Sequence, residues 1–389
     1  MTNKANSRLL SLDVLRGITI AGMIMVNNPG SWSSVYAPLR HAEWNGLTPT
    51  DLVFPFFMFI MGISTYISLR KFNFEFSKPT LLKILKRTLV IFLIGLGLAW
   101  LGISFRTYHS LGNENIGIFE RFIKSITSFE HIRILGVMQR LALTYGITSI
   151  IAILVKHRYI PYIIIVTLIG YFLLLLFGNG FEFSESNIVS VIDKAILGVN
   201  HMYTDNGVKL DPEGLISTIP AICHVLIGFY CGKILFSTKD NNERISHLFI
   251  IGAILTFAGF LLSYGCPVNK KIWTPTFVLA TCGLASTLLA LLIWIIDIKG
   301  YSRWSVFFES FGVNPLFIYV AAGVCATLFG GILFPYNDGT ISIQGFVYSI
   351  CLQPYLGDYL GSWGYSLLFV GLMWAIGNIL YKKHIYIKI

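Results

Sequence analysis

The sequence has few charged residues and lacks several common catalytic motifs. Only 12% of its 389 residues are Asp, Glu, Lys or Arg, whereas 55% are hydrophobic, and the mean hydropathy is +0.70. Soluble domains carry about twice that share of charge. No P-loop, His-Glu-x-x-His or Gly-x-Ser-x-Gly pattern occurs, so an ATPase, a zinc protease or a serine hydrolase loses its main support. We therefore expect a polytopic membrane protein.

Cysteine is scarce and lacks the spacing of a metal site. The six cysteines are Cys223, Cys231, Cys266, Cys282, Cys325 and Cys351. Most fall inside apolar runs, so they are expected to be small core residues, and no metal site is predicted. The chain also has no Asn-x-Ser/Thr sequon, which favours a bacterial plasma membrane over a glycosylating organelle.

Ten apolar stretches are long enough to cross a bilayer as helices. They cover residues 12–28, 50–69, 84–104, 134–155, 159–178, 215–236, 245–264, 274–296, 305–330 and 362–381. With the N-terminus inside, the cytoplasmic segments hold most of the Lys and Arg and the outer loops most of the acids, as the positive-inside rule requires. We predict one all-α transmembrane domain over residues 1–389 with both termini cytoplasmic. The net charge of +10 then reflects topology rather than nucleic-acid binding.

A polar stretch separates the first two apolar runs. It places Asn27, His41 and Asp51 at the outer ends of two consecutive spans. An imidazole held by a carboxylate can accept a proton from an attacking amine or hydroxyl, or can itself take an acyl group. The Asn27 amide could supply a hydrogen bond to an oxyanion. Asp51 also fits the first turn of a helix capped by Thr48, so a capping role and a catalytic role both stay open.

Several polar side chains lie inside or beside the apolar runs, where they are costly. Arg16 follows Asp13 by one helical turn, which fits either a local ion pair or a contact with a phosphate. Arg140 is expected about two turns inside the fourth span, and Asn314 near the start of the ninth. The loop after the second span is a basic cluster that could receive the phosphates of a nucleotide cofactor. Its members are Arg70, Lys71, Lys78, Lys83, Lys86 and Arg87.

The stretch around His41 has a specific pattern. From His41 to Gly62 it reads His-x-x-Trp-Asn-Gly-Leu-Thr, then Asp-Leu-Val-Phe-Pro-Phe-Phe-Met-Phe-Ile-Met-Gly. Supporting motifs are Ser11-Leu12-Asp13, Arg16-Gly17, Val26-Asn27, Gly136-Val137-Met138-Gln139-Arg140-Leu141, Asp211-Pro212-Glu213-Gly214, Val268-Asn269-Lys270 and a lysine-rich last turn at Lys382. On these motifs, the chain resembles the heparan-α-glucosaminide N-acetyltransferase family of transmembrane acyltransferases over nearly its whole length.

The resemblance implies an enzyme that moves acetyl from cytosolic acetyl-CoA to the amine of a terminal glucosamine or related amino sugar across the membrane. It assigns His41 and Asn27 to the active site, with Asp51 at the position of a matching acid. We expect the acceptor to contact Trp32, Tyr36, Trp44, Asn45, Asp211 and Glu213. We expect acetyl-CoA, the co-substrate, to contact Arg16, Arg70, Lys71, Lys86, Arg87, Arg140 and Asn314.

Some alternatives stay open at this point. Direct transfer is favoured over an acetyl-His41 intermediate, because an acyl-imidazole hydrolyses readily at a water-facing site. The chain could instead be an O- or N-acyltransferase acting on a cell-envelope glycan, or a sugar transporter or flippase without chemistry. A transporter predicts broken helices in two related halves, which the sequence does not display. Expected partners are acetyl-CoA, an amino-sugar or oligosaccharide acceptor and the bilayer, but no nucleic acid; small-residue helix faces would also suit a homodimer.

Overall fold

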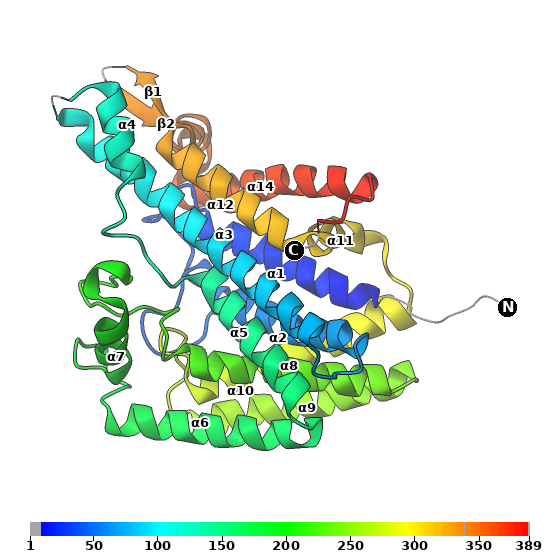
Figure 1. Cartoon of the computed structure of the whole chain (residues 1–389). Coiled ribbons are helices and arrows are strands. Elements are labelled where there is room, and N and C mark those ends of the chain that lie inside the picture. The colour runs from blue at the N-terminus through cyan, green and yellow to red at the C-terminus, as the bar shows by residue number, and fades with distance from the viewer. Residues whose placement is uncertain (1–8, 115, 338, 388–389) are drawn as a thin grey trace.

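The computed structural model describes residues 9–114, 116–337 and 339–387 as a bundle of long helices (Figure 1). Its helices are α1 (Leu10–Asn27), α2 (Thr50–Arg70), α3 (Lys78–Ser110), α4 (Ile118–Ile126), α5 (Val137–Leu154), α6 (Ile160–Phe177), α7 (Ile188–Leu197), α8 (Thr218–Ser237), α9 (Asn241–Leu262), α10 (Pro275–Leu292), α11 (Val306–Val313), α12 (Pro315–Gly331), α13 (Ile343–Phe346) and α14 (Gln353–Lys382). Its strands are β1 (Leu333–Tyr336) and β2 (Gly339–Ser342).

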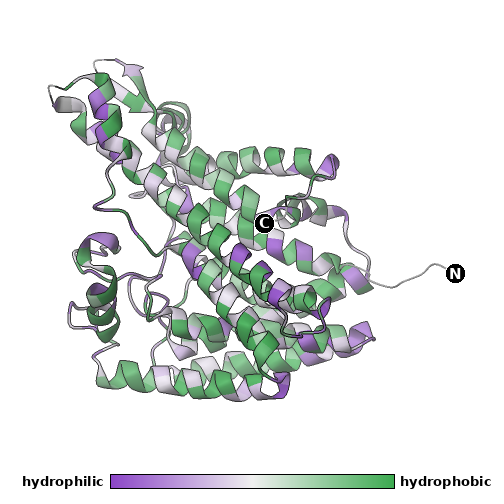
Figure 2. Cartoon of the chain, viewed as in Figure 1, coloured by the Kyte–Doolittle hydropathy of each residue, from purple (hydrophilic) through white to green (hydrophobic). Residues whose placement is uncertain are grey.

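The helices match the expected polytopic architecture. Among the described residues, nine helices are long and apolar enough to cross a membrane, or ten if α11 and α12 form one broken span. Helix α1 begins and α14 ends at the same end of the bundle (Figure 1). We call this the basic end, because α2 ends there at Arg70 and Lys71; the opposite end, where α2 and α5 begin, is the site end. Apolar residues dominate the lengths of the helices and hydrophilic residues gather towards their ends (Figure 2).

Side-chain caps explain where several long helices begin. The Ser77 hydroxyl accepts a hydrogen bond from the backbone N–H of Thr80 at the start of α3. In α10, Thr274 accepts from the N–H of Phe277 in the same way. A proline occupies the first turn of both helices, where its missing N–H costs nothing.

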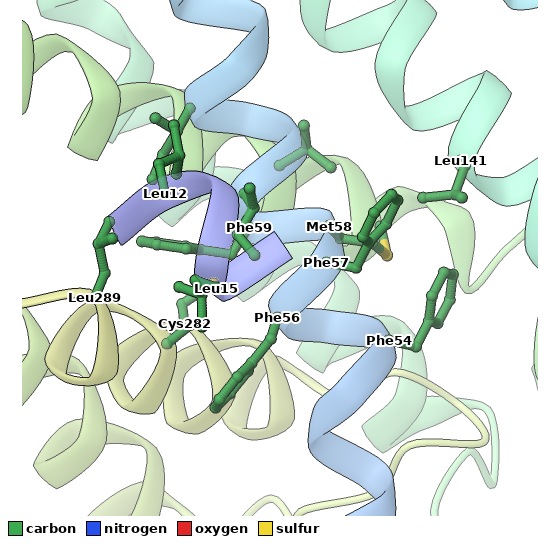
Figure 3. Close-up of a cluster of buried hydrophobic side chains, with 14 of the residues drawn as sticks. Leu12, Leu15, Phe54, Phe56, Phe57, Met58, Phe59, Leu141, Cys282 and Leu289 are labelled. Carbon is green, nitrogen blue, oxygen red and sulfur yellow. The ribbon is translucent and has the colours of Figure 1, made fainter. Parts of the chain in front are cut away.

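The core is centred on α2, which lies between α1, α5, α8 and α10. Its residues Phe56, Met58 and Phe59 are buried, with Leu15 of α1 and Leu289 of α10 close to them (Figure 3). Apolar side chains surround α2 on several sides and hold it rigidly. The first turn of α2 carries Asp51, so this part of the polar site is fixed as well.

The close contact between α2 and α8 depends on small residues. A Cβ atom on Gly228 of α8 would collide with the backbone of Phe59, and one on Gly62 of α2 would collide with the backbone of Val225. Gly228 belongs to the Gly-x-x-x-Gly pattern that the sequence offers for close packing. The two helices can therefore approach each other only because both positions lack a side chain.

Two span boundaries differ from the predicted ones. Helix α3 has 33 residues, which corresponds to a length of about 50 Å and exceeds the bilayer core. Helix α5 begins at Val137 because Gly136 is extended, with φ −152°. Arg140 therefore lies in the first turn of α5, and the expectation that it lies two turns inside the span was wrong.

The ninth span is broken rather than kinked. Segments 303–313 and 315–331 are bent by 76° at Asn314, whose φ of −126° and ψ of 52° are not helical. Pro315 has no N–H to continue the hydrogen-bond ladder. The Asn314 amide instead donates to the carbonyl of Ile385 and accepts from the N–H of Ile387, each at 2.8 Å. Asn314 thus anchors the C-terminal tail.

The segment before the last span contains a hairpin that the sequence interpretation missed. Strands β1 and β2 pair antiparallel there, with Leu333 opposite Ser342. Helix α13 and one π-helical segment follow, and Gly357, with φ 74°, separates them from the membrane-spanning part of α14. The six cysteines are all free, so no disulfide links Cys266 to Cys351.

Candidate active site

His41 and Asp51 form the centre of the site. The His41 Nδ1 atom lies 2.6 Å from Asp51 Oδ1, and the Asp51 side chain is only 1% exposed. The His41 side chain, in contrast, is 45% exposed. An ionised carboxylate only accepts hydrogen bonds, so Nδ1 carries the hydrogen and, in the neutral ring, Nε2 is the nitrogen with a lone pair that can accept a proton.

The second oxygen of Asp51 binds the loop that leads into α2. Its Oδ2 atom accepts from the backbone N–H groups of Ala42 and Thr48 and from the Thr48 hydroxyl, at 3.1, 3.2 and 2.9 Å. The predicted cap is found only in part: Oδ2 accepts from the Thr48 N–H, as the acid of a capping box does, but no side chain of the described residues accepts from the free N–H groups of α2, whose N-cap is Pro49. The other oxygen holds the imidazole. Since α2 is packed in the core, this arrangement fixes the ring relative to the bundle.

Lys270 is the residue at this centre that the sequence interpretation did not select. Its Nζ atom lies 3.0 Å from His41 Nδ1, 3.5 Å from His41 Nε2 and 3.4 Å from Asp51 Oδ1. Burial lowers the pKa of Lys270, against the opposing effect of Asp51 and Glu213. The Val268-Asn269-Lys270 motif was the available signal, although nothing in the sequence placed it beside His41.

One backbone hydrogen bond and one side-chain hydrogen bond join the Lys270 loop to the His41 loop. The Gly46 N–H donates to the Val268 carbonyl at 2.8 Å, and the Asn269 amide donates to Asn45 Oδ1 at 3.1 Å. Asn269 Oδ1 also accepts from the N–H of Ile272. Asn45, expected to bind the acceptor, thus lies where it connects two loops.

These groups border a cavity of about 440 Å³ at the site end. This volume is in the range of small-molecule sites. Its lining includes Met23, Val26, Asn27, Trp32, His41, Glu43, Asp51, Phe54, Arg133, Val137, Tyr203, Asp205, Glu213, Lys270, Lys271 and Tyr319. The structure therefore brings together five of the predicted residues, namely Asn27, Trp32, His41, Asp51 and Glu213.

A larger cavity of about 770 Å³ lies elsewhere, between α6, α8, α9 and α10. Its walls are almost entirely apolar, with residues such as Ile165, Phe172, Ile254 and Leu261. Proton transfer near neutral pH is most often carried out by His, Asp, Glu or Lys, and none of these is among the lining residues of this apolar cavity. We therefore place the candidate chemistry in the smaller cavity.

An ionic cluster forms one wall of that cavity. Arg133 Nε donates to Asp211 Oδ2 at 3.0 Å, and its Nη2 contacts both Asp211 Oδ1 and Glu213 Oε2 at 2.5 Å. Burial opposes the ionisation of Glu213, yet Arg133 and Arg140 hold the pKa of this carboxyl below its usual value. Asp211 is fully buried behind the wall and also accepts from the N–H of Tyr203.

Arg140 belongs to this end of the molecule. Its Nη2 donates to the Gly214 carbonyl at 3.1 Å and to the Ser217 hydroxyl, and its guanidinium lies 4.9 Å from the centre of the Trp273 ring. Asp193 on α7 lies behind the same loop and accepts from the N–H of Leu215. Arg140 is thus at the opposite end of the bundle from the basic residues of the α2–α3 connection with which it was grouped.

Two aromatic residues expected at the acceptor lie outside the lining. Tyr36 packs against Tyr359, with ring centres 5.4 Å apart. The Trp44 indole donates to the Phe181 carbonyl at 2.8 Å, and its ring lies 5.1 Å from that of Phe183. Trp32, which does line the cavity, is 66% exposed.

The residues expected to hold the cofactor occupy four places. Arg70, Lys71, Lys86 and Arg87 lie around the α2–α3 connection at the basic end, where Arg87 stacks over the Tyr145 ring at 4.6 Å. Arg16 lies on α1 and donates to Asp13, Ser64 and the Gly312 carbonyl. The expected Asp13–Arg16 ion pair is confirmed at 2.9 Å. Arg140 lies beside the Gly214 carbonyl at the site end, and Asn314 lies at the break between α11 and α12. The α2–α3 group is therefore the candidate site for the CoA phosphates.

Comparison with known proteins agrees with the motifs. A family model described as heparan-alpha-glucosaminide N-acetyltransferase, catalytic, matches residues 8–264. The heparan-alpha-glucosaminide N-acetyltransferase of Mus musculus is 28% identical over 384 residues, and that of Homo sapiens is 29% identical over 376 residues. Each alignment covers 83% of this chain and 54% of the relative, so the chain spans about half the length of these curated relatives. The chain belongs to the heparan-alpha-glucosaminide N-acetyltransferase catalytic family.

Proposed function

We propose that this protein is a membrane acetyltransferase that moves acetyl from acetyl-CoA to the amine of an amino sugar. The observation that carries the proposal is the His41–Asp51 pair, with a free imidazole nitrogen beside a cavity of about 440 Å³. The basic residues around the α2–α3 connection lie at the opposite end of the bundle and would hold the phosphates of CoA. Acetyl would then cross the membrane as the thioester.

In the proposed reaction, His41 Nε2 accepts a proton from the acceptor amine as the nitrogen attacks the thioester carbonyl. The C–N bond forms and the C–S bond breaks, and the proton passes to the thiolate sulfur of CoA. Asp51 keeps the ring in the tautomer that this step needs, and Asn27 lies in the cavity wall where its amide can contact the thioester. Direct transfer requires both substrates in the cavity together.

A route for the pantetheine arm is supported by a second, small void. This void is lined by Ile20, Met23, Phe57, Val137, Leu141, Leu316 and Tyr319. It shares Met23, Val137 and Tyr319 with the active-site cavity and extends between α1, α2, α5 and α12. Its volume of about 10 Å³ means that these apolar side chains must move apart for a pantetheine arm to pass.

For the acceptor, the cavity offers Trp32 as a stacking surface and Glu213 and Asp205 as hydrogen-bond acceptors for hydroxyl or ammonium groups. We place the protein in a bacterial plasma membrane, with this cavity on the outer side. Tyr36, Trp44, Asn45 and Asp211 would then shape the surrounding loops, and small-residue helix faces would suit a homodimer.

The proposal is tested with the purified protein in nanodiscs, labelled acetyl-CoA and a panel of glucosamine, galactosamine, glucose and N-acetylglucosamine. We expect label on the two free amines and none on the two sugars without one. His41→Ala should lower kcat by about 1,000-fold while acetyl-CoA still binds. Exposed His131, on an outer loop, provides the matched control, and His131→Ala should keep full activity.

Two results would contradict the proposal. One is the absence of transfer to every amine by the unaltered protein, and the other is an unchanged kcat in His41→Ala. Incubation without acceptor separates the two routes of transfer. Acetylated protein that forms in the unaltered chain and not in His41→Ala would replace the direct route with an acetyl-histidine route.

A further inference from the structure

Lys270 lies beside the His41 imidazole, where Nδ1 is already bound to a carboxylate and only the long 3.5 Å contact to Nε2 could accept one of its hydrogens. Its Nζ atom is close to both ring nitrogens of His41, at 3.0 and 3.5 Å. The in-plane direction of Nδ1 is already occupied by Asp51 Oδ1 at 2.6 Å. Because Nδ1 donates its hydrogen to that carboxylate, it cannot also accept one from Lys270. The ammonium group therefore lies beside the ring without a hydrogen bond to Nδ1.

The other cations of the cavity wall are already engaged. Arg133 donates to both Asp211 and Glu213, and Lys271 donates to Asp205. For Lys270, the nearest carboxylate oxygen is Asp51 Oδ1 at 3.4 Å, which exceeds an ordinary N–H···O distance. Of Arg133, Lys270 and Lys271, Lys270 is the one with no carboxylate oxygen within ordinary hydrogen-bond distance, so its three N–H groups are the least engaged by the protein.

Lys270 is also held in place rather than free to swing. Its side chain is 16% exposed, and the preceding Asn269 is fixed by the Asn45 amide and by Thr274 Oγ1, which accepts from the Asn269 N–H at 3.0 Å. The negative charge of Asp51 keeps the ammonium beside the ring. A donor fixed before the reaction stabilises a developing charge more than a mobile one does.

We infer that Lys270 is a further catalytic residue, whose ammonium donates a hydrogen bond to the thioester carbonyl oxygen as that oxygen becomes an oxyanion. This inference rests on the proposed acetyl transfer. The amine nitrogen forms a bond to the carbonyl carbon, and the C=O electron pair moves onto the oxygen beside Lys270. The pair then returns, the C–S bond breaks, and the amine proton held by His41 goes to the sulfur. Lys270 gains and loses no proton.

The position of Lys270 relative to His41 Nε2 allows it to reach the carbonyl oxygen. An amine held by His41 Nε2 is one bond from the carbonyl carbon during attack, and the oxyanion is one bond further. Lys270 Nζ lies 3.5 Å from Nε2, so the oxygen falls within reach of its N–H groups. The neutral amide of Asn27 would be the second donor from the α1 side of the cavity.

The test compares Lys270→Gln, Lys270→Arg and the unaltered protein for glucosamine acetylation. Loss of one oxyanion donor should lower kcat by about 100-fold to 1,000-fold in Lys270→Gln, with the acetyl-CoA Kd changed by less than about threefold. Lys270→Arg keeps the cation and should recover part of that loss. Lys124→Gln removes a half-exposed lysine of α4 and should act like the unaltered protein.

Melting temperature is measured for each variant, because a purely structural lysine would lower it together with kcat. A Lys270→Gln variant that keeps its kcat within about threefold overturns this role while leaving the acetyltransferase proposal intact. So does a kcat loss that Lys270→Arg fails to relieve at an unchanged melting temperature. If the unaltered protein transfers no acetyl, the proposed function fails and the role of Lys270 fails with it.

Discussion

Two ionic groups border the same cavity, and their hydrogen-bonding atoms are used differently. In the first, Asp51 holds His41 through one oxygen, and the imidazole keeps a free nitrogen on the cavity side. In the second group, both carboxylate oxygens of Asp211 accept hydrogen bonds from Arg133, and Glu213 binds the same guanidinium. An ion pair supports chemistry only when one partner retains an unsatisfied atom that a substrate can reach.

The exposure of the two groups differs in the same way: the carboxylates are buried in both, but the side chain that can meet a substrate is more exposed in the His41–Asp51 group. Asp51 and Asp211 are both at most 1% exposed, but the His41 side chain is 45% exposed and that of Arg133 is 31% exposed with its donors engaged. We therefore expect substitutions in the first group to change kcat, and substitutions in the second to change the free energy of unfolding. Three variants sharpen or break this distinction.

The largest effect is expected for Asp51→Asn. An asparagine can still accept hydrogen bonds from the loop that leads into α2, but it favours the wrong imidazole tautomer and carries no charge. We expect kcat to fall by about 100-fold to 10,000-fold. The loss of capping should cost only about 1 kcal/mol of stability. Steady-state kinetics and thermal melting check both parts, and a stable variant with normal kcat would remove Asp51 from the mechanism.

The helical architecture was predictable because each span carries its own signal. A run of about twenty apolar residues must satisfy its backbone internally, and a helix does so without help from distant segments. The ends of the helices were harder to predict than their existence, because local caps such as Ser77 set them. Helix α3 is therefore longer than its apolar part. The β1–β2 hairpin escaped because its four-residue strands have no comparable signal.

The centre of the site was predictable only where its members are close in sequence. His41 and Asp51 are ten residues apart, and the helix start between them limited their geometry. Lys270 reaches the same point from 229 residues away through a loop contact that no local pattern encodes. The hydrogen bond between Asn45 and Asn269 could not be predicted for the same reason, because Asn269 lies on that distant loop.

A smaller effect, on stability rather than catalysis, is expected for Asp211→Asn. This change removes one charge from a buried pair, and Arg133 keeps Glu213 as a partner. Breaking a buried ion pair on one side typically costs about 3 to 5 kcal/mol, and the remaining partner should hold the loss near the lower end. Melting in detergent measures it. Folded Asp211→Asn that loses as much kcat as Asp51→Asn would abolish the distinction between the two groups.

The smallest effect is a change in pH dependence at Asp193, which lies on α7 behind the second group. Burial raises the pKa of this carboxyl to about 6, and the negative charge of nearby Asp211 raises it further. The hydrogen bonds from the N–H groups of Ile216 and Leu215 lower the pKa and offset part of this rise. Its ordinary pKa is about 4.

Because the folded state holds this proton more tightly than the unfolded chain, the contribution of Asp193 to stability is fully present below pH 4 and is lost as the pH rises through 6. The loss amounts to at most about 3 kcal/mol. Asp193→Asn keeps an oxygen for the Leu215 and Ile216 N–H groups but cannot ionise. Its melting temperature, measured from pH 4 to pH 7, should therefore fall less than that of the unaltered protein. Parallel curves for the two proteins would mean that Asp193 is already ionised throughout this range, satisfied by Arg140 in the way that Asp211 is satisfied by Arg133.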